Sequence, residues 1–429
     1  MAALDDRVDV LIEGGVVVRA GRGAGDSLVG QPGVQLVEGA GRWLLPGFID
    51  LHVHFREPGE EHKETIASGL RAAVAGGFVT VCAMPNTKPV NDTRAITELM
   101  LARAKEAALA RLHPIGAITK GLAGAELTEV AALREAGCVA LSDDGRCVTD
   151  SRVMRHALEY AATFDVPLIQ HAEDHALTAG ADMHEGAIST RLGLRGWPRT
   201  AEDVIVARDC ILAEAAKARY HVAHLSTKGA ARIVAEAKAR GGAVTAEVTP
   251  HHLLLTDASV AEGLGYRTEC KVNPPLREPE DLAALRQALA DGTIDAIATD
   301  HAPHHLRDKQ VEFSAARPGM IGLELCVPLL LDLVRSGELP LMRLAYALTV
   351  GPAKVVGLEA PRLIEGARAD LTLVDPDATF RVERETLAGK STNTPFLGRT
   401  VRGAIDATFV DGRPVHLRRG AAGLSGLVD

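Results

Sequence analysis

Two histidines stand one residue apart in the stretch DLHVHFREPG, residues 50–59, and an arginine follows two positions later. Successive side chains of a β-strand point to opposite faces, so residues i and i+2 share a face. A strand here would place the polar residues 50, 52, 54 and 56 on one face and the apolar residues 51, 53 and 55 on the other. Two imidazoles at this spacing can bind one metal ion, and a pair of hydrogen-bonded core histidines is the alternative. The arginine offers a planar pair of donors to a carboxylate, with a surface salt bridge as its alternative.

Other predicted strands also end in residue types that bind metals. His171 ends the strand in LIQHAED, His224 ends the one in HVAHLS, and Asp300 ends the one in IATDH. A pair of carboxylates, Asp143 and Asp144, ends the strand in LSDD. Each residue alone could be structural, but the carboxyl ends of parallel barrel strands meet at one face, where active sites form. Five strands that end in this way favour a shared metal site.

Strand alternation also separates neighbouring residues at these ends. Only one of Asp300 and His301 should face the site, because adjacent side chains point to opposite faces. The same reasoning favours Asp144 over Asp143 as the inward carboxylate. His221 lies at the start of its strand, so we expect a structural role for it.

The middle of the chain alternates short apolar strands with amphipathic helical patterns. The eight predicted strands cover residues 47–54, 79–85, 112–119, 138–145, 167–174, 220–227, 243–252 and 294–304. Eight βα units in about 300 residues predict an α/β fold with a TIM-type (β/α)8 barrel. A doubly wound open sheet is the competing fold, and it is disfavoured because no GxGxxG motif follows an early strand.

Local signals predict where several helices lie. In SRVMRHALEYAA, residues 151–162, one apolar stripe contains Val153, Met154, Ala157, Leu158 and Ala161. Thr200 and Asp203 form a capping-box pattern at the start of another helix. Gly76 and Gly77 predict the end of the helix that precedes the second strand.

The two ends of the chain have a different pattern, with strand-like segments at 8–18, 36–47, 369–383 and 404–417. Asp411-Gly412 in the last segment predicts a hairpin turn. We therefore expect residues 1–46 and 355–429 to form one composite β-sandwich domain and residues 47–354 to form the catalytic barrel.

Composition excludes several classes of protein. The net charge of −9 and the lack of a basic run argue against nucleic-acid binding. The first residues do not resemble a signal peptide, and no apolar run is long enough to span a bilayer. The six cysteines are scattered without a CxxC pair, which is typical of reduced thiols in a cytoplasmic protein.

Taken together, several motifs resemble the amidohydrolase superfamily and, more closely, class I dihydroorotase. They are DLHVHFREPG preceded by LLPG, together with AMPNT, VNPPLR and ATDHAPHH, and the resemblance covers about residues 8–417. The resemblance implies zinc-dependent, reversible cyclisation of N-carbamoyl-L-aspartate to dihydroorotate, the third step of pyrimidine synthesis. It also implies two zinc ions per chain, bridged by Asp144 and a hydroxide. Many relatives use a carboxylated lysine as the bridge, but no lysine stands at this strand end.

The resemblance further assigns roles residue by residue. Asp300 matches the catalytic aspartate, which also touches metal. The implied metal ligands are His52, His54, Asp144, His171, His224 and Asp300, and the implied substrate-binding residues are Arg56, Asn86, Asn273, His304, Pro318 and Gly319. Pro318 replaces the bulkier apolar residue expected at its position.

Two alternative functions remain at this point. An allantoinase or hydantoinase would act on a ring without the carboxylate that Arg56 could bind. A non-catalytic homologue that serves as a structural partner of aspartate transcarbamoylase should have lost its metal ligands. We also expect a homodimer, a possible association with aspartate transcarbamoylase, and a polar loop at 304–320 over the mouth of the barrel.

Overall fold

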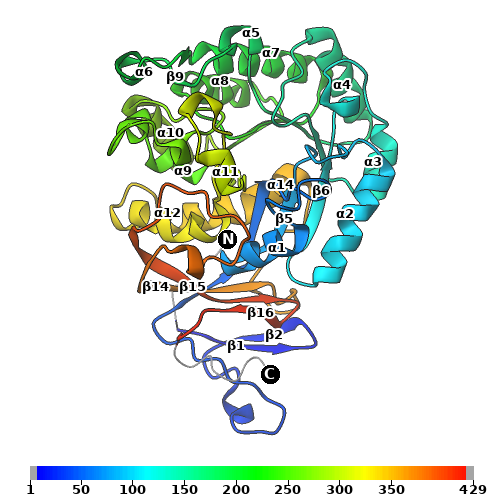
Figure 1. Cartoon of the computed structure of the whole chain (residues 1–429). Coiled ribbons are helices and arrows are strands. Elements are labelled where there is room, and N and C mark those ends of the chain that lie inside the picture. Colours follow the sequence, from blue (N-terminus) through cyan, green and yellow to red (C-terminus); the bar gives the residue numbers. More distant parts are fainter. Residues whose placement is uncertain (1–6, 422–429) are drawn as a thin grey trace.

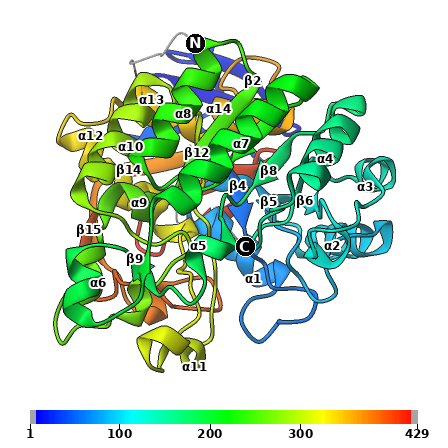
Figure 2. The same ribbon diagram turned by 90° about the horizontal axis from the view of Figure 1, so that it is seen from above.

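The computed structural model describes residues 7–421 of the chain. Its centre is an eight-stranded parallel sheet in the order β13-β12-β11-β8-β7-β6-β5-β4. A bridge between Val53 and His301 joins the two edge strands, so the sheet closes into a barrel (Figure 2). The barrel strands are β4 Phe48–Val53, β5 Phe78–Ala83, β6 Arg111–Gly116, β7 Ala140–Ser142, β8 Leu168–Gln170, β11 Tyr220–Val222, β12 Val244–Val248 and β13 Ala296–Ile297. The predicted barrel is thereby confirmed.

Helices connect the strands and surround the barrel (Figures 1 and 2). These are α1 Ile66–Ala75, α2 Arg94–Ala107, α3 Val130–Ala136, α4 Ser151–Thr163, α7 Thr200–Ala216, α8 Lys228–Ala239, α10 Pro279–Asp291, α12 Cys326–Arg335, α13 Leu341–Leu348 and α14 Val350–Val356. Within the described residues 7–421, no helix is both long and apolar enough to cross a membrane.

Shorter elements decorate the connections at the carboxyl ends of the strands. They are η2 Lys120–Leu122, α5 His175–Thr178, β9 Met183–His184, α6 Ala187–Leu192, β10 Gly196–Trp197, α9 Pro250–Leu254, η3 Asp257–Ala261, η4 Thr268–Cys270, α11 Leu306–Lys309, η5 Phe313–Ala315 and η6 Leu323–Leu325. Two of them, α11 and η5, lie inside the segment 304–320, so the predicted loop contains helical turns.

The two ends of the chain meet below the barrel and form small sheets there (Figure 1). A four-stranded sheet has the order β16-β15-β14-β3, and β1 pairs with β2. The elements of this region are β1 Asp9–Glu13, β2 Val16–Gly21, η1 Asp26–Leu28, β3 Trp43–Pro46, β14 Leu371–Arg381, η7 Arg384–Thr386, β15 Thr400–Val410 and β16 Arg413–Leu417. Asp411 and Gly412 both have positive φ, 49° and 73°, as the predicted two-residue hairpin requires. The small β domain built from both ends is present, and the domain boundaries drawn from the sequence remain a prediction.

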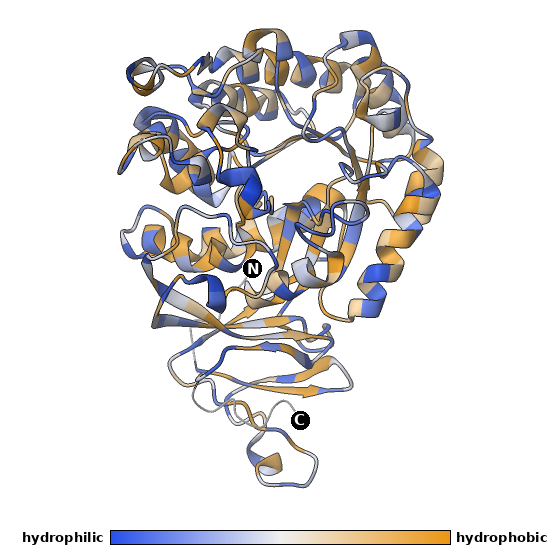
Figure 3. Ribbon diagram, viewed as in Figure 1, coloured by the Kyte–Doolittle hydropathy of each residue, from blue (hydrophilic) through white to orange (hydrophobic). Residues whose placement is uncertain are grey.

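Hydrophobic residues lie on both sides of the barrel strands, inside the barrel and between the strands and the helices. Figure 3 shows hydrophobic residues along the strands and in the small sheets. One cluster, with Ile49, Leu51, Ile115 and Ile169, draws its members from the barrel strands and from the region of α14, and fills the barrel interior. A larger cluster packs the strands against the surrounding helices. The predicted stripe of α4 is confirmed, because all five of its residues are buried. The predicted helix end is also confirmed, since α1 ends at Ala75 and Gly77 has a φ of +85°.

Three local predictions need correction. The apolar row of β4 does not keep to one face, because Leu51 belongs to the interior cluster whereas Val53 and Phe55 pack in the outer layer. A register shift between Asp50 and Val53 breaks the alternation. The strand predicted at 243–252 ends at Val248, because Pro250 starts α9.

The third correction concerns the start of α7. No capping box forms there, since Thr200 is the first helical residue and Arg199 occupies the N-cap position. The carboxylate of Asp203 instead accepts a hydrogen bond of 2.5 Å from the hydroxyl of Thr227, at the start of α8. A tertiary contact thus replaces the predicted local one.

Candidate active site

The carboxyl ends of the barrel strands bring four histidines and two aspartates into one buried cluster. It consists of His52, His54, Asp144, His171, His224 and Asp300, the six residues predicted to bind metal. Most of them lie just beyond their strands, because the strands are shorter than predicted. His224 and Asp300 have positive φ angles of 31° and 47°, a strained backbone that is concentrated at functional sites.

Asp144 lies at the centre of this cluster. Its carboxylate oxygens are 3.3 Å from His52 Nε2, 3.5 Å from His54 Nε2, 3.6 Å from His171 Nδ1 and 3.5 Å from His224 Nε2. The preceding Asp143 faces away, and its carboxylate accepts hydrogen bonds from the backbone N–H groups of residues 118 and 119. The structure therefore separates the two carboxylates as strand alternation suggested.

Asp300 faces the same cluster from the opposite side of the barrel. Its Oδ1 lies 3.0 Å from His54 Nε2 and 3.6 Å from His52 Nε2. Burial by itself would raise the pKa of Asp300, but the hydrogen bond with His54 and the nearby histidines hold that pKa well below its usual range. Asp300 is therefore ionised at neutral pH. Its neighbour His301 instead accepts the backbone N–H of Gly322 at 3.2 Å.

Three of the histidines are held by acceptors at their outer ring nitrogens. His52 Nδ1 lies 2.8 Å from a carboxylate oxygen of Glu247, and His54 Nδ1 lies 2.9 Å from the amide oxygen of Asn86. In His171 it is Nε2 that is held, 3.0 Å from Glu173. Each acceptor can take the proton of the outer nitrogen, so that the inner nitrogen would be free to offer its lone pair to a metal ion.

The donor set of this cluster fits a divalent cation. Ligand atoms of His52, Asp144 and His224 lie within 4.8 Å of one another, and so do those of His52, His54 and Asp300. His52 Nε2 and Asp144 Oδ1 are buried and lack a hydrogen-bond partner among the described residues 7–421. Burial would lower the pKa of His52, yet the carboxylates of Asp144 and Glu247 raise it well above its usual value. A site that attracts a proton this strongly also attracts a cation, which can replace that proton.

Two of the predicted substrate-binding residues, Arg56 and His304, lie near each other. Arg56 is buried enough to lower its pKa, and its Nε donates to the carbonyl oxygen of Pro303 at 3.2 Å. His304 hydrogen-bonds through Nε2 to the carbonyl oxygen of Pro318 at 2.9 Å. Burial and the charge of Arg56 lower the pKa of His304 to about 2, so this imidazole is neutral.

The remaining predicted residues have defined positions as well. Asn86 donates from Nδ2 to the carbonyl oxygen of Asp144 at 3.3 Å, and Asn273 donates to Glu173 at 3.1 Å. Asn273 Oδ1 is buried and lacks a hydrogen-bond partner within residues 7–421. Gly319 has a φ of +129°, and a Cβ there would lie 2.7 Å from the side chain of Ala302. Only glycine fits this position.

Sequence reasoning missed three residues that support the cluster. Glu173 and Glu247 hold metal-binding candidates, and Asn393 donates to the carbonyl oxygens of Ala302 and Gly319 at 3.0 and 3.1 Å. Glu173 could have been predicted from the sequence, because it stands two residues after His171. Glu247 and Asn393 gave no comparable signal, because their partners lie far away in the sequence.

Solved structures of related enzymes share this architecture. The L-hydantoinase (dihydropyrimidinase) from Arthrobacter aurescens superposes with a TM-score of 0.82 over 95% of this chain and 92% of its own, at 24% identity. The D-hydantoinase (dihydropyrimidinase) from Thermus sp. gives a TM-score of 0.80 over 96% and 93%, at 25% identity. These likenesses concern the fold.

The barrel, with its histidines and aspartates gathered at the strand ends, defines an amidohydrolase-type enzyme. The family model "Dihydro-orotase-like" matches residues 41–230. A dihydroorotase of Anaeromyxobacter dehalogenans (strain 2CP-1) is 57% identical over 89% of this chain and 88% of its own length, and one of Pelobacter propionicus is 51% identical over 97% and 96%. The chain belongs to the dihydroorotase family.

Proposed function

We propose that this protein is a class I dihydroorotase, which interconverts N-carbamoyl-L-aspartate and (S)-dihydroorotate in pyrimidine biosynthesis. The observation that carries the proposal is the identity of 48–57% with relatives named dihydroorotase over most of the chain. The site supports it, because the cluster predicted to bind metal lies beside the partly buried cation of Arg56. Such a pairing suits a substrate that carries both a hydrolysable ring amide and a carboxylate.

Two zinc ions are the cofactor that we propose for the cluster, with Asp144 between them. His52 and His54 would hold one ion, His171 and His224 the other, and Asp300 would contact the first. When bound, such ions supply the Lewis acidity that activates water and polarises the ring carbonyl. The ions' identity and number rest on the resemblance and on the donor set described above.

The residues of the chain then have separable tasks. In ring opening, the ionised carboxylate of Asp300 accepts the proton of the attacking water and passes it to the leaving ring nitrogen. Arg56 holds the substrate carboxylate, and Asn86 and His304 complete the polar wall around it. Asn273 and the backbone at Pro318 and Gly319 fix the opposite edge of the ring. In ring closure the proton moves in the reverse direction, from the attacking nitrogen of N-carbamoyl-L-aspartate to Asp300 and then to the water that leaves.

The alternative activities are less well supported. The hydantoinases share the fold at 21–25% identity, far below the identity to dihydroorotases. Hydantoin and allantoin also lack a ring carboxylate that could use Arg56. A non-catalytic role is disfavoured because all six ligand candidates are present and converge.

Partners and location remain proposals. A homodimer and an association with aspartate transcarbamoylase are retained from the sequence as predictions. A cytoplasmic location agrees with the six cysteines, all of which are buried and unpaired.

A turnover assay tests the proposed function. The purified protein should convert dihydroorotate and N-carbamoyl-L-aspartate into each other and should leave hydantoin and allantoin unchanged. It should contain up to two zinc ions, and His171→Ala should deplete one of them. Preferred turnover of hydantoin would overturn the proposed substrate, and full activity in metal-free protein with chelator would overturn the proposed cofactor.

A further inference from the structure

A chain of buried side chains leads from His52 through the interior of the barrel, away from the active site. Glu247, in β12, has one carboxylate oxygen 2.8 Å from His52 Nδ1 and the other 3.2 Å from His221 Nε2. His221, in β11, has its Nδ1 2.8 Å from the hydroxyl oxygen of Thr245. Glu247, His221 and His52 are each fully buried. Three strands are thus linked through side chains in one continuous series.

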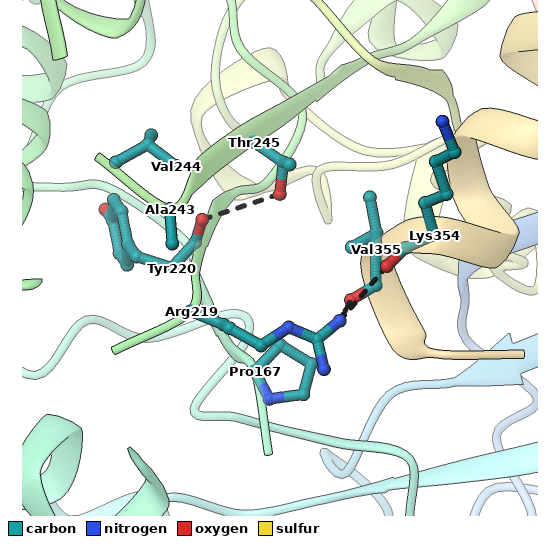
Figure 4. Close-up of a pocket in the computed structure, with 8 residues that line it drawn as sticks. All are labelled: Pro167, Arg219, Tyr220, Ala243, Val244, Thr245, Lys354 and Val355. Atoms are coloured by element: carbon teal, nitrogen blue, oxygen red, sulfur yellow. Dashed lines mark hydrogen bonds between the residues drawn. The ribbon is translucent and has the colours of Figure 1, made fainter. Parts of the chain in front are cut away.

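The series ends at the opposite end of the barrel from the site. Thr245 lines a hollow of about 150 Å³ together with Arg219, Lys354 and Val355, and Figure 4 shows these residues around it. The guanidinium of Arg219 closes one side by donating to the carbonyl oxygens of Lys354 and Val355 at 3.0 and 2.7 Å. The hydroxyl of Thr245 also lies 3.4 Å from the carbonyl oxygen of Tyr220, to which it can donate.

These contacts assign the position of each proton along the series. His221 Nε2 donates to Glu247, so Nδ1, the remaining nitrogen of that ring, is left to accept the hydroxyl proton of Thr245. The Glu247 carboxylate, which can only accept, also takes the proton of His52 Nδ1. Its oxygen toward His52 additionally lies 3.3 Å from the backbone nitrogen of His224, so Glu247 contacts two ligand candidates. His52 Nε2, which lies 3.3 Å from Asp144 and 3.6 Å from Asp300, is consequently the nitrogen that would bind a metal ion.

We propose that Glu247, oriented by His221 and Thr245, is a positioning residue that fixes the tautomer and orientation of His52 for metal binding. This inference deepens the proposed function and rests on it. Buried partners of metal-binding histidines commonly change metal affinity by about ten- to a hundredfold when they are removed. Glu247 would act through His52 and does not itself touch the substrate.

The test measures metal binding in Glu247→Gln, which keeps the shape and removes the charge. We expect a ten- to hundredfold weaker affinity for zinc in a competition assay with a chromophoric chelator. In protein loaded with cobalt(II), we expect altered visible absorption bands, because the geometry at His52 changes. A milder variant, Thr245→Val, removes only the far end of the series and should weaken the affinity by a few fold.

A matched control separates this role from the general cost of neutralising a buried carboxylate. Asp406, in the small β domain, is fully buried and accepts from Arg42 and Arg418 at 2.5 and 2.6 Å. Asp406→Asn should lower the melting temperature while leaving zinc affinity and the cobalt spectrum unchanged.

The outcomes distinguish the inference from the proposed function. Zinc affinity within twofold of wild type and an unchanged cobalt spectrum in Glu247→Gln would overturn the inference alone. If Glu247→Gln does not fold, Thr245→Val decides, and wild-type affinity in that variant would overturn the inference. A wild-type protein that binds no divalent cation would overturn the inference and the proposed cofactor together.

Discussion

At the scale of single residues, the chemistry depends on which side chains are charged and which nitrogen of each imidazole is free. Glu247 illustrates this. Burial would raise its pKa, but hydrogen bonds with His221 and His52 outweigh burial and lower the pKa to about 2. A carboxylate that stays ionised in the barrel interior can accept a histidine proton, which is the role proposed for Glu247 at His52.

Arg56 should decide substrate preference. Arg56→Ala would remove the proposed charge-assisted contact with the substrate carboxylate, which we expect to cost on the order of 2–5 kcal/mol. This corresponds to about two to three decades in kcat/KM for both directions of the reaction. Arg56→Lys should recover only part of the loss, because an ammonium lacks the planar fork. Zinc content, measured in parallel, should not change. Near wild-type kinetics in Arg56→Ala would mean that the carboxylate is bound elsewhere.

Asp144 should make the enzyme independent of carbon dioxide. A carboxylated lysine needs bicarbonate for its assembly, whereas an aspartate carboxylate is already present in the chain. Stripped protein should therefore regain full activity when zinc is added in bicarbonate-free buffer. The comparison is the same reconstitution with added bicarbonate. A strict requirement for bicarbonate would show that a different residue bridges the metals.

At the scale of elements, the positions of the strand ends and of the connecting segments determine the shape of the site. The segment 304–320 is anchored by the buried ammonium group of Lys309. Lys309 Nζ donates to the carbonyl oxygens of Thr268, Lys271 and Arg317 at 2.9, 3.2 and 2.7 Å. These contacts keep His304 and Gly319 in place beside the cluster.

The junction between η6 and the segment after η7 should be sensitive to pH. Glu324 accepts from the backbone N–H groups of Ala388 and Gly389, yet burial outweighs these bonds and raises its pKa to about 7. The folded state then binds more protons than the unfolded state between pH 4.5 and 7. The stabilisation from Glu324 is fully present below pH 4.5 and is lost as the pH rises through 7.

Glu324→Gln should abolish that pH dependence. The difference in unfolding free energy between wild type and variant should change by about 3 kcal/mol between pH 4.5 and 8. The wild type should become less stable relative to the variant as the pH rises. Urea unfolding at several pH values measures this difference, and the remaining titrating groups cancel in the comparison. A difference that is constant with pH would contradict the assigned pKa.

At the scale of the whole molecule, the hydrophobic core around the barrel extends into the small β domain, which also has a hydrophobic cluster of its own. Val374 of β14 and Ile405 of β15 belong to the same cluster as the barrel strands and helices. Side chains also cross the boundary. Thr372 donates to the carbonyl oxygen of Gly77 at 2.8 Å, and Arg111 of β6 pairs with Asp370 at 2.8 Å.

We therefore expect both regions to unfold in a single calorimetric transition. Asp370→Ala should lower the unfolding free energy by about 2 kcal/mol, because it leaves Arg111 without its buried partner. Glu159→Gln, which breaks the exposed pair between Arg155 and Glu159, is the control and should change stability by less than about 0.5 kcal/mol. Two resolved transitions, only one of which shifts in Asp370→Ala, would contradict the coupling of the two regions.

The sequence by itself determined the alternation of strands and helices, the small β domain and the identity of the clustered residues. Local patterns contain this information. The hairpin at Asp411 needs only two residues that tolerate positive φ, and the stripe of α4 needs only the helical period. Asp144 faces the cluster and Asp143 faces away, as the two-residue period of a strand predicts, although the strand itself ends at Ser142.

Only the tertiary structure decided the contacts that depend on register between distant strands. Glu247 reaches His52 across 195 positions in the sequence, and Asp203 binds Thr227 in place of the N-cap. The bulge in β4 sends Leu51 inward and Val53 outward, which strict alternation did not predict. Such features arise because closure of the barrel brings side chains from distant parts of the sequence together in its interior. A buried carboxylate must be hydrogen-bonded, and its donors are the side chains that the closed barrel places next to it.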